Sequence, residues 1–336
     1  MPDDTRQWPR ISVITPSYNQ GRFLGECLDS VFRQDYPDLE VIVIDGGSTD
    51  GSVAVIKAHE ARLTYWCSEP DAGQGAAINK GLRLATGELV AWLNADDFYL
   101  PGALASVARA YRQNPHASFY FGDGLRVYKN GDPAGGFFPG GHVGFDLRAF
   151  VYGLNCLLQP ATFINRARLS EVGLLDPALR YGLDTDLWIR LATHAPPSPV
   201  AALLAASREY PETKTSTGSF ARVEELRQIA ERHGGVAMTP GALCYFLDTL
   251  LRHARERKDI FPESYEQSIQ TFWGATAKLL ADYGAGLDGF PLSGRQPEGD
   301  CTRESEDATF ELRRFAAALL RRFVRKGRPG TQGKEA

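Results

Sequence analysis

The chain has 336 residues, of which 43% are hydrophobic and 23% charged, a composition typical of a folded protein with one large core and a smaller part. Its net charge of −4 gives no overall attraction for nucleic acid, so we expect no nucleic-acid partner. Five scattered cysteines without a CxxC pair favour a reducing compartment. The N-terminal residues lack a secretory pattern, and no window approaches the roughly 20 apolar residues of a membrane span. We therefore expect a cytoplasmic protein.

Apolar segments of strand length alternate with helical patterns over the first hundred residues. Continuous β-branched segments predict strands buried on both faces at 11–15, 39–45, 63–67 and 88–93. The segments between them have apolar residues on one helical face, at 22–34, 52–61 and 76–85. This alternation predicts an α/β fold with an open, mostly parallel, twisted sheet and helices on both faces, in a Rossmann-like arrangement. The ligand crevice of such a sheet lies beyond the carboxyl ends of its strands.

The pattern changes further along the chain. Shorter strands of mixed direction are expected at 118–123, 124–131 and 159–166, with a mobile Gly/Pro-rich loop at 131–144. A helix is predicted at 184–194 with Asp184 as its N-cap, and only helical patterns follow residue 218. The predicted organisation is an α/β domain at 1–217 with halves at about 10–115 and 116–217, a helical extension at 218–286, a linker at 287–301, and a basic helix and tail at 302–336.

Asp45 follows directly on the second predicted strand, in "VIDGGSTDGS". A tight turn and a helix cap explain Gly46 to Asp50. For Asp45 we favour another role, because a carboxylate in the crevice can accept a hydrogen bond from a nucleobase N–H. No G-x-G-x-x-G motif follows the first strand, which argues against an ordinary dinucleotide site. Tyr18 could stack on a base or, equally, pack on the first helix.

The segment "NADD" follows the predicted strand 88–93. Asp97 alone would be explained as the N-cap of a helix that begins near Pro101, but this leaves Asp96 without a role. Two adjacent carboxylates become tolerable when Mg²⁺ or Mn²⁺, shared with a diphosphate, balances their charge. We therefore predict a divalent-cation site at Asp96 and Asp97, with Asn94 supporting it by a hydrogen bond.

A second acidic pair, Asp184 and Asp186, opens the helix in "GLDTDLWIRL". Residues two apart diverge on a helix, so the two carboxylates should have separate tasks. Asp186 is predicted to pair with Arg190, four residues later. Asp184 could take a proton from a hydroxyl in the crevice, and a simple helix cap is an equally good interpretation of these residues alone.

Taken together, "ISVITPSYNQGRFLGECLDSVFRQDYPDLEVIVIDGGSTDGS" and "SEPDAGQGAAINKGLRLATGELVAWLNADD" resemble the family 2 glycosyltransferases of the GT-A fold, especially bacterial enzymes that build surface polysaccharides. The likeness covers roughly residues 10–215. It implies inverting transfer from a nucleotide-diphosphate sugar, with a UDP-sugar favoured, to a glycan or lipid-linked acceptor. The donor-binding residues it implies are Pro16, Ser17, Tyr18, Asn19, Asp45, Gly75, Asn79, Lys80, Asn94, Ala95 and Asp96.

The resemblance also implies roles for the later motifs. "NADD" is similar to the family's metal-binding D-x-D element, with Asn94 in place of the first aspartate. "LDTDLWIR" is similar to the segment that carries the catalytic base, which assigns this role to Asp184, with Leu183 where the family usually has glutamate. Residues expected on the acceptor side or in a phosphate-contacting closing loop are Asp123, Gln159, Trp188, Arg208, Lys214 and Thr215. For Asp123 and Gln159 a structural hydrogen-bonding role is an equal alternative.

Other reaction classes fit the residues less well. Hydrolysis would use two carboxylates around one bond, whereas one group here is assigned to metal. Nucleotidyl transfer would need a glycine-rich basic loop after the first strand, which "TPSYNQGR" does not provide. A catalytically idle module that binds nucleotide sugar or glycan is the remaining alternative, and the retention of Asp184 and of "NADD" argues against it.

The C-terminal segment "FELRRFAAALLRRFVRKGR" combines an apolar helical stripe with seven basic residues and no acid between positions 313 and 328. The stripe consists of Leu312, Phe315, Leu319 and Phe323. Such a helix could pack on its own domain or lie on an anionic membrane surface. The second interpretation would bring the protein to the inner face of the cell membrane by reversible contact.

Overall fold

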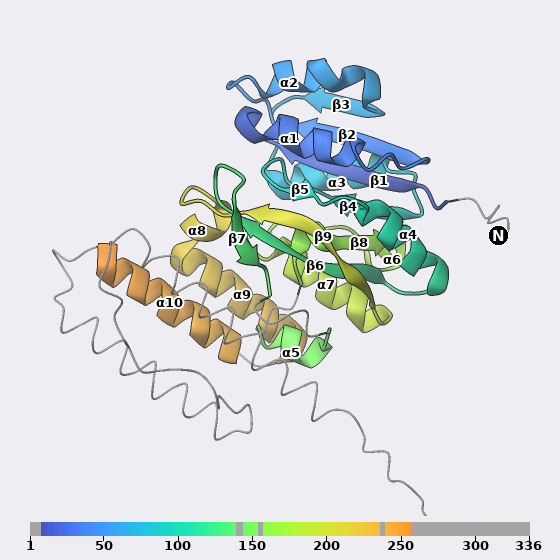
Figure 1. The fold of residues 1–336 in the computed structure, drawn as a ribbon. Helices are drawn as coiled ribbons and strands as arrows, with labels where there is room; N and C mark the ends of the chain where they lie inside the picture. The colour runs from blue at the N-terminus through green and yellow to red at the C-terminus, as the bar shows by residue number, and fades with distance from the viewer. Residues whose placement is uncertain (1–7, 139–143, 154–156, 236–238, 257–336) are drawn as a thin grey trace, which may run out of the picture. The chain divides into compact units, whose positions relative to one another are not determined.

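The computed structural model describes residues 8–138, 144–153, 157–235 and 239–256, shown in colour in Figure 1. The chain divides into two compact units, the first made of residues 1–137 and 157–217 and the second of residues 138–156 and 218–336. The predicted linker and the basic C-terminal helix lie outside the described residues.

The first unit contains one mixed sheet (Figure 1). Within the described residues its strands are β1 (Ile11–Ser17), β2 (Leu39–Asp45), β3 (Tyr65–Ser68), β4 (Leu89–Trp92), β5 (Phe98–Tyr99), β6 (Phe119–Val127), β7 (Pro133–Gly136), β8 (Thr162–Asn165) and β9 (Ser198–Arg208). They follow the order β3-β2-β1-β4-β8-β6-β9-β5, and β7 pairs with β6. The strands β1 to β4 are parallel to one another, whereas β8 is antiparallel to β4 and to β6. The predicted α/β class and the parallel first half are confirmed.

Helices connect and cover these strands. They are α1 (Gly21–Phe32), α2 (Ser52–His59), α3 (Gln74–Leu84), α4 (Ala103–Gln113), α6 (Arg166–Val172), α7 (Leu183–His194) and α8 (Lys214–Thr217), with short 3₁₀ turns η1 (Glu60–Arg62) and η2 (Gln159–Ala161). The chain moves outward from β1 to β3 and then returns to β4 on the other side of β1. Right-handed crossovers therefore require α1 and α2 on one face and α3 on the other. The reversal makes the carboxyl ends of β1 and β4 the switch point where ligands of such sheets bind.

The core of this unit lies on both sides of its central strands. Every residue of β1 is buried, and Trp92 at the end of β4 stacks on Trp188 of α7 with ring centroids 5.4 Å apart. The segment 63–67 was predicted as a strand buried on both faces, and this is wrong. The observed β3 is an edge strand that pairs only with β2 among the described strands, so Tyr65 remains 39% exposed.

Two other local predictions need correction. The predicted loop 131–144 contains a strand, β7, whose backbone pairs antiparallel with β6. The helix predicted at 184–194 begins one residue earlier, at Leu183, and its N-cap is Gly182 rather than Asp184.

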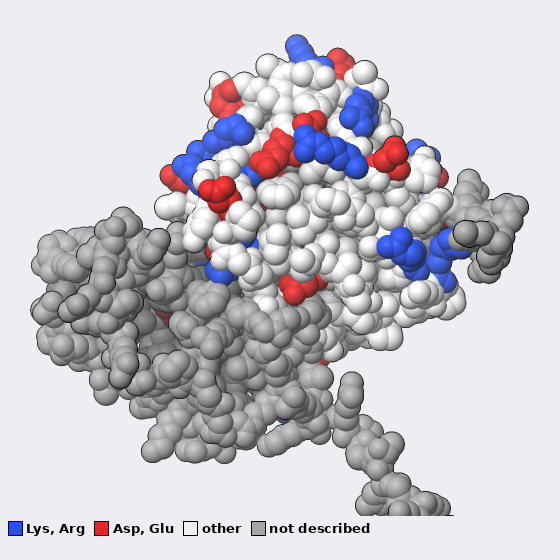
Figure 2. Space-filling model, in the orientation of Figure 1, with Lys and Arg blue, Asp and Glu red and all other residues white. Residues whose placement is uncertain are grey.

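On the face shown in Figure 2, acidic and basic side chains of the described residues are mixed, and neither sign forms a continuous patch.

The second unit is helical in its described part, as the pattern after residue 218 predicts. It contains α5 (Leu147–Val151), α9 (Ser219–Gly234) and α10 (Pro240–Glu256). The backbone after α5 approaches the first turn of α10 closely at Gly153 and Gly241. Glycine is needed at position 241, because a Cβ there would clash with the carbonyl oxygen of Gly153. None of the helices in the described ranges has both the length and the hydropathy needed to cross a bilayer.

Candidate active site

The predicted donor residues gather where the parallel strands end. Ser17, the last residue of β1, pairs with Asp45, the last residue of β2, and Pro16 lies one step earlier in the same register. The loop that carries Asn94 and Asp96 follows β4, the other neighbour of β1. These side chains come together because parallel strands place their carboxyl ends at one edge of a sheet.

Asp45 organises the turn after β2. Its carboxylate is fully buried and accepts hydrogen bonds from the hydroxyls of Ser48 and Ser68, both at 2.6 Å, and from the backbone N–H groups of Ser48 and Gly47 at 2.9 and 3.2 Å. Burial tends to raise the pKa of Asp45, but the hydrogen bonds from Ser48 and Ser68 outweigh it and hold the pKa below its ordinary value. Asp45 is thus an ionised hub of the turn.

The turn after β1 is tied to the same segment. Asn19 has a positive φ of 52°, and its backbone N–H donates to the hydroxyl of Ser48 at 2.8 Å. Its side-chain oxygen accepts a hydrogen bond from the backbone N–H of Thr49 at 2.9 Å. The loops after β1 and β2 therefore form one connected surface.

Gly46, directly after β2, lies close to the side chains of Tyr18 and Asp71. Tyr18 is 63% exposed, so most of its side chain is not packed against the protein. A Cβ on Gly46 would lie 3.3 Å from the ring of Tyr18 and 3.0 Å from a carboxylate oxygen of Asp71, so a side chain there would fill the space between them. Asp71 was missed from the sequence, although it belongs to the segment "SEPDAGQG" that follows β3.

The two adjacent aspartates differ in their surroundings. Asp97 is 5% exposed, and its carboxylate accepts hydrogen bonds from the backbone N–H of Arg208 at 3.0 Å and from the amide of Asn94 at 3.3 Å. Burial, reinforced by the charge of Asp96, raises the pKa of Asp97 to about 8. The alternative of Asp97 as a helix cap is wrong, since the N-cap of α4 is Gly102. Asp97 fastens its loop to the end of β9.

Asp96 is partly exposed and keeps one oxygen open. Its Oδ2 accepts a hydrogen bond from the hydroxyl of Tyr210 at 2.7 Å, and its backbone carbonyl accepts one from Nε of Arg208 at 3.0 Å. No group in the described part of the chain donates to its Oδ1. Across the described residues no group of three or more Asp, Glu, His or Cys side chains is arranged so that it could hold a metal ion by itself. Because Mg²⁺ and Mn²⁺ commonly take one or two carboxylates and complete their shell with phosphate and water, this donor set fits such a cation through Asp96.

A relay of amide side chains supports the loop that carries Asp96. Lys214 donates to the side-chain oxygen of Gln74 at 2.7 Å, and Gln74 donates to that of Asn94 at 2.8 Å. Asn94 donates to Gln159 at 3.0 Å, and Gln159 donates to the carbonyl of Trp92 at 2.9 Å. The predicted supporting role of Asn94 therefore has a structural basis. Gln74 was missed, although it stands directly before the predicted Gly75.

Asp184 lies in the first turn of α7 and is partly exposed. Its carboxylate accepts a hydrogen bond from the backbone N–H of Thr185 at 2.7 Å. The preceding Leu183 is buried, and its side chain lies 4.0 Å from where a Cβ on Gly75 would be, so the start of α7 adjoins the start of α3. Asp186 is buried and accepts a hydrogen bond from Nε of Arg190 at 2.8 Å, which confirms the predicted pair.

Four predicted residues are engaged elsewhere. Asn79 exchanges two hydrogen bonds with the backbone of Leu175, and Lys80 donates to the carboxylate of Glu69 and to the thiol of Cys67. Trp188 is 1% exposed inside the core. Asp123 accepts a hydrogen bond from the backbone N–H of its neighbour Gly124. Direct contact of these residues with a ligand stays a prediction.

The remaining predicted residues belong to the end of β9, to α8 and to the "NADD" loop. Arg208 has a side chain only 2% exposed, and it donates to the carboxylate of Glu26 at 2.6 Å and to the carbonyl of Lys129 at 2.9 Å. Thr215 is exposed, whereas Ala95 is buried. The geometry thus gives Arg208 a structural task beside Asp96, and its contact with phosphate stays a prediction.

Known proteins resemble this chain in sequence and in fold. The sequence model described as "Glycosyl transferase family 2" matches residues 12–146. An uncharacterised glycosyltransferase of Mycobacterium tuberculosis (strain ATCC 25618 / H37Rv) is 32% identical over 198 residues, which cover 58% of this chain and 74% of the relative. One of Rickettsia typhi is 28% identical over 199 residues, covering 54% and 58% of the two chains.

Two solved structures share the fold. Residues 1–349 of S. aureus TarS, in complex with UDP-GlcNAc, give a TM-score of 0.55 at 18% identity, covering 95% of this chain and 92% of that one. The mannosyltransferase PcManGT of Pyrobaculum calidifontis, in complex with GDP-Man and Mn²⁺, gives 0.53 at 21% identity, covering 97% and 90%. At these identities the likeness concerns the fold, which is GT-A. The sequence matches add the family, and the chain belongs to glycosyltransferase family 2.

Proposed function

We propose that the protein transfers a sugar from a nucleotide-diphosphate sugar, with a UDP-sugar favoured, to a hydroxyl of a saccharide or lipid-linked acceptor, with inversion at the anomeric carbon. The observation that carries this proposal is the open oxygen of Asp96 at the switch point, with Asp184 in the turn of α7 that adjoins α3. Family membership supports glycosyl transfer, and the similar folds of proteins with bound UDP-GlcNAc or GDP-Man support such donors.

The nucleoside is proposed to lie beside Gly46, next to Tyr18 and Asp71. Tyr18 is exposed there and would stack on the base. Asp71 would accept a hydrogen bond from a base N–H beside it. Asp45 would accept another, as the sequence predicts, provided that Ser48 or Ser68 gives up its place on the buried carboxylate.

The diphosphate is proposed to lie between Asp96 and the start of α8. Asp96 would hold Mg²⁺ or Mn²⁺, which when bound neutralises the charge of the departing diphosphate. Lys214 would supply a further positive charge, because its ammonium group already reaches the amide relay behind Asp96. Asp97, Thr215 and Arg208 would shape the site around them.

Asp184 is proposed to be the general base. A partly exposed carboxylate in the first turn of a helix can accept a proton from an acceptor hydroxyl as that oxygen attacks. One displacement from the face opposite the leaving diphosphate inverts the configuration. Asp123 and Gln159 are proposed to line the acceptor side.

The cellular role is proposed to be synthesis of a cell-surface polysaccharide or glycolipid in the cytoplasm. The apolar stripe and the seven basic residues of the C-terminal segment would give reversible contact with an anionic membrane, where a lipid-linked acceptor resides. Co-sedimentation with anionic vesicles should fall when the chain is truncated after Asp300, and equal binding by the truncated protein would refute the membrane contact.

A donor screen tests the main proposal. The wild-type protein is incubated with UDP-, GDP- and dTDP-sugars in Mn²⁺ or in excess EDTA, with oligosaccharide and lipid-linked acceptors, and the released nucleotide is measured. We expect release from one class of donor that requires the metal and increases with acceptor. Nucleotide binding without release from any donor and acceptor combination would instead favour the idle binding module.

A further inference from the structure

We infer that Tyr210 is a positioning residue that fixes the carboxylate of Asp96, so that Oδ1 is the oxygen presented to the cation and diphosphate of the donor. This inference rests on the proposed function. It assigns a task in donor binding to a residue that none of the sequence motifs singled out.

The hydroxyl of Tyr210 is held by hydrogen bonds on both sides. It donates to Oδ2 of Asp96 at 2.7 Å and accepts from the side-chain amide of Gln20 at 3.3 Å. A hydroxyl has one proton to donate, and the amide of Gln20 can only donate here. The proton of Tyr210 therefore points at Asp96, which commits Oδ2 and leaves Oδ1 open.

Packing fixes the ring that carries this hydroxyl. Tyr210 is 6% exposed, and its ring centroid lies 5.4 Å from that of Phe23 on α1. The guanidinium of Arg22 and the ammonium of Lys129 lie 5.2 and 5.7 Å from the Tyr210 ring centroid. The ring cannot swing away from Asp96 without breaking these contacts, so the direction of the hydrogen bond is preset.

The backbone of Asp96 is anchored from the same segment. Nε of Arg208 donates to its carbonyl, and the same guanidinium donates to the carboxylate of Glu26 on α1. Two residues near the end of β9 thus hold the main chain and the side chain of Asp96 independently. A phenol hydroxyl carries one proton, which it can donate to a carboxylate.

Loss of the hydroxyl should weaken metal binding and leave the fold intact. Hydrogen-bond partners of metal ligands typically contribute about 10- to 100-fold to metal affinity. In Tyr210→Phe the ring contacts remain, and we expect the dissociation constant of Mn²⁺ to rise about tenfold. Mn²⁺ is titrated into protein saturated with UDP, or with GDP where wild type binds GDP more tightly, and free Mn²⁺ is followed by electron paramagnetic resonance. Nucleotide affinity in EDTA should stay within twofold of wild type.

Tyr36→Phe is the matched control. The hydroxyl of Tyr36 donates to the carbonyl of Pro9 at 2.6 Å, and the residue is 8% exposed, but it lies before β2, at the opposite edge of the sheet. This variant loses a similar buried hydrogen bond, and its Mn²⁺ affinity should match wild type.

The outcomes separate this inference from the proposed function. If Asp96→Asn abolishes Mn²⁺ binding while Tyr210→Phe binds Mn²⁺ within twofold of wild type, the positioning role is refuted and the metal site stands. If Tyr210→Phe and Tyr36→Phe weaken Mn²⁺ binding equally, the effect is a general loss of stability, which also refutes it. A wild type that binds no Mn²⁺ with either nucleotide overturns the proposed metal site together with this inference.

Discussion

Acidic residues lie at both ends of the parallel strands β1, β2 and β4, but the surroundings of their carboxylates differ. We call the end where these strands begin the amino edge and the end where they finish the carboxyl edge. At the amino edge, Glu40 of β2 is 4% exposed and accepts hydrogen bonds from the hydroxyl of Ser12 at 2.5 Å and from the backbone and hydroxyl of Thr86 at 2.8 and 3.0 Å. At the carboxyl edge, Asp96 accepts one side-chain hydrogen bond, from the hydroxyl of Tyr210 to Oδ2, and no described group donates to its Oδ1. Both oxygens of Glu40 are thus engaged by protein groups, whereas Asp96 has one oxygen available for a ligand.

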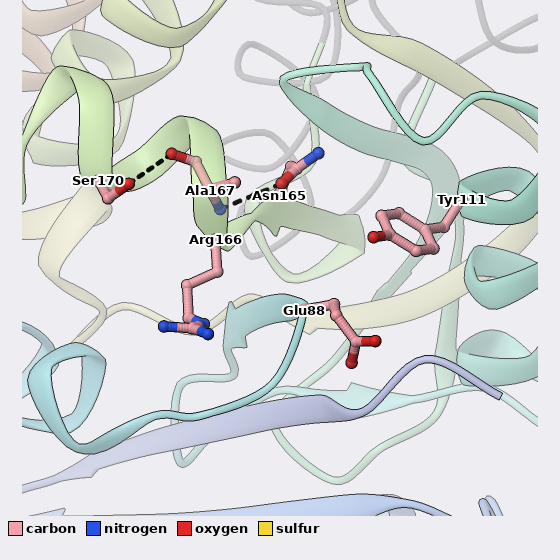
Figure 3. Close-up of a pocket in the computed structure, with 6 residues that line it drawn as sticks. All are labelled: Glu88, Tyr111, Asn165, Arg166, Ala167 and Ser170. Carbon is pink, nitrogen blue, oxygen red and sulfur yellow. Dashed lines mark hydrogen bonds between the residues drawn. The ribbon is translucent and has the colours of Figure 1, made fainter. Parts of the chain in front are cut away.

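A pocket of about 300 Å³ lies at the amino edge (Figure 3). Its lining consists of Glu88, Tyr111, Asn165, Arg166, Ala167 and Ser170. Glu88 accepts a hydrogen bond from the backbone of Arg10, Arg166 donates to the carbonyl of Gly87, and Asn165 caps α6. Each of these three residues makes a hydrogen bond within the chain, and the pocket does not lie at the carboxyl ends of the parallel strands, so the presence of a cavity does not by itself identify the donor site.

Asp184→Asn should have the largest effect. Removal of the general base is expected to lower turnover by about 10² to 10⁴, or roughly 3 to 5 kcal/mol of barrier, with nucleotide affinity unchanged. Steady-state turnover and calorimetric titration of UDP would measure the two quantities. Asp38→Asn, a partly exposed carboxylate at the amino edge, is the control and should retain wild-type turnover. An Asp184→Asn variant with more than about a tenth of wild-type turnover would move the base to another residue, first to Asp123.

Asp96 and Asp97 of "NADD" should affect different properties when each is substituted alone. Asp96→Asn should weaken Mn²⁺ binding by more than about a hundredfold, beyond the range for hydrogen-bond partners of metal ligands, because it removes the charge of the proposed ligand itself, and it should leave the melting temperature near that of wild type. Asp97→Asn should mainly lower the melting temperature, because Asp97 is buried and bonded to the backbone of Arg208. Metal titration and thermal unfolding of both variants would check this. Equal loss of metal binding in two stable variants would make both residues ligands.

Glu40→Gln tests the amino edge. One of its acceptor oxygens becomes an NH₂ group that faces donors from Ser12 and Thr86, so we expect a loss of about 1 to 3 kcal/mol in the free energy of unfolding. Turnover of the folded protein should not change. Glu171→Gln, with a side chain 43% exposed, is the control and should lower the free energy of unfolding less than Glu40→Gln does. A Glu40→Gln protein of normal stability but low turnover would contradict the structural role.

Asp45→Asn should have the smallest effect and a distinct pH dependence. The pKa of Asp45 in the folded protein lies below its unfolded value, so the ionised group stabilises the fold at pH above the unfolded value and less as the pH falls through the folded value. Urea unfolding of wild type and variant should therefore differ at pH 7, by about 1 kcal/mol, and converge as the pH falls below the pKa of Asp45 in the folded protein. A difference that does not depend on pH would mean that the charge of Asp45 is not involved.

The sequence predicts which residues lie at the carboxyl edge better than it predicts the contacts that these residues make with other segments. Asp45 and Asp96 could be found because each follows a buried apolar strand, and parallel strands bring such positions to one edge. The pair of Asp186 and Arg190 follows from helical spacing. The burial of Trp188 could not be read in this way, since the same helical position would suit a binding face.

The contacts that were missed join residues far apart in the chain. Tyr210 and Asp96 are separated by 114 positions, and they meet because β9 runs parallel to β6 and ends beside the "NADD" loop. No local pattern encodes that pairing. The same reason explains why the sequence did not predict the contacts of the Arg208 guanidinium, which is buried among the carbonyl of Asp96, the carboxylate of Glu26 and the carbonyl of Lys129.

The central claim is that the nucleotide-sugar donor binds at the carboxyl edge and not in the pocket at the amino edge. Hydrogen–deuterium exchange of the wild-type protein, with and without UDP and Mn²⁺, tests it most directly. We predict slower exchange of backbone amides in 16–19, 45–49, 94–97 and 208–214, and unchanged exchange in 86–88 and 165–170 around the amino-edge pocket. Protection confined to the segments around Glu88 and Arg166, or none at the carboxyl edge with nucleotide bound, would contradict the account.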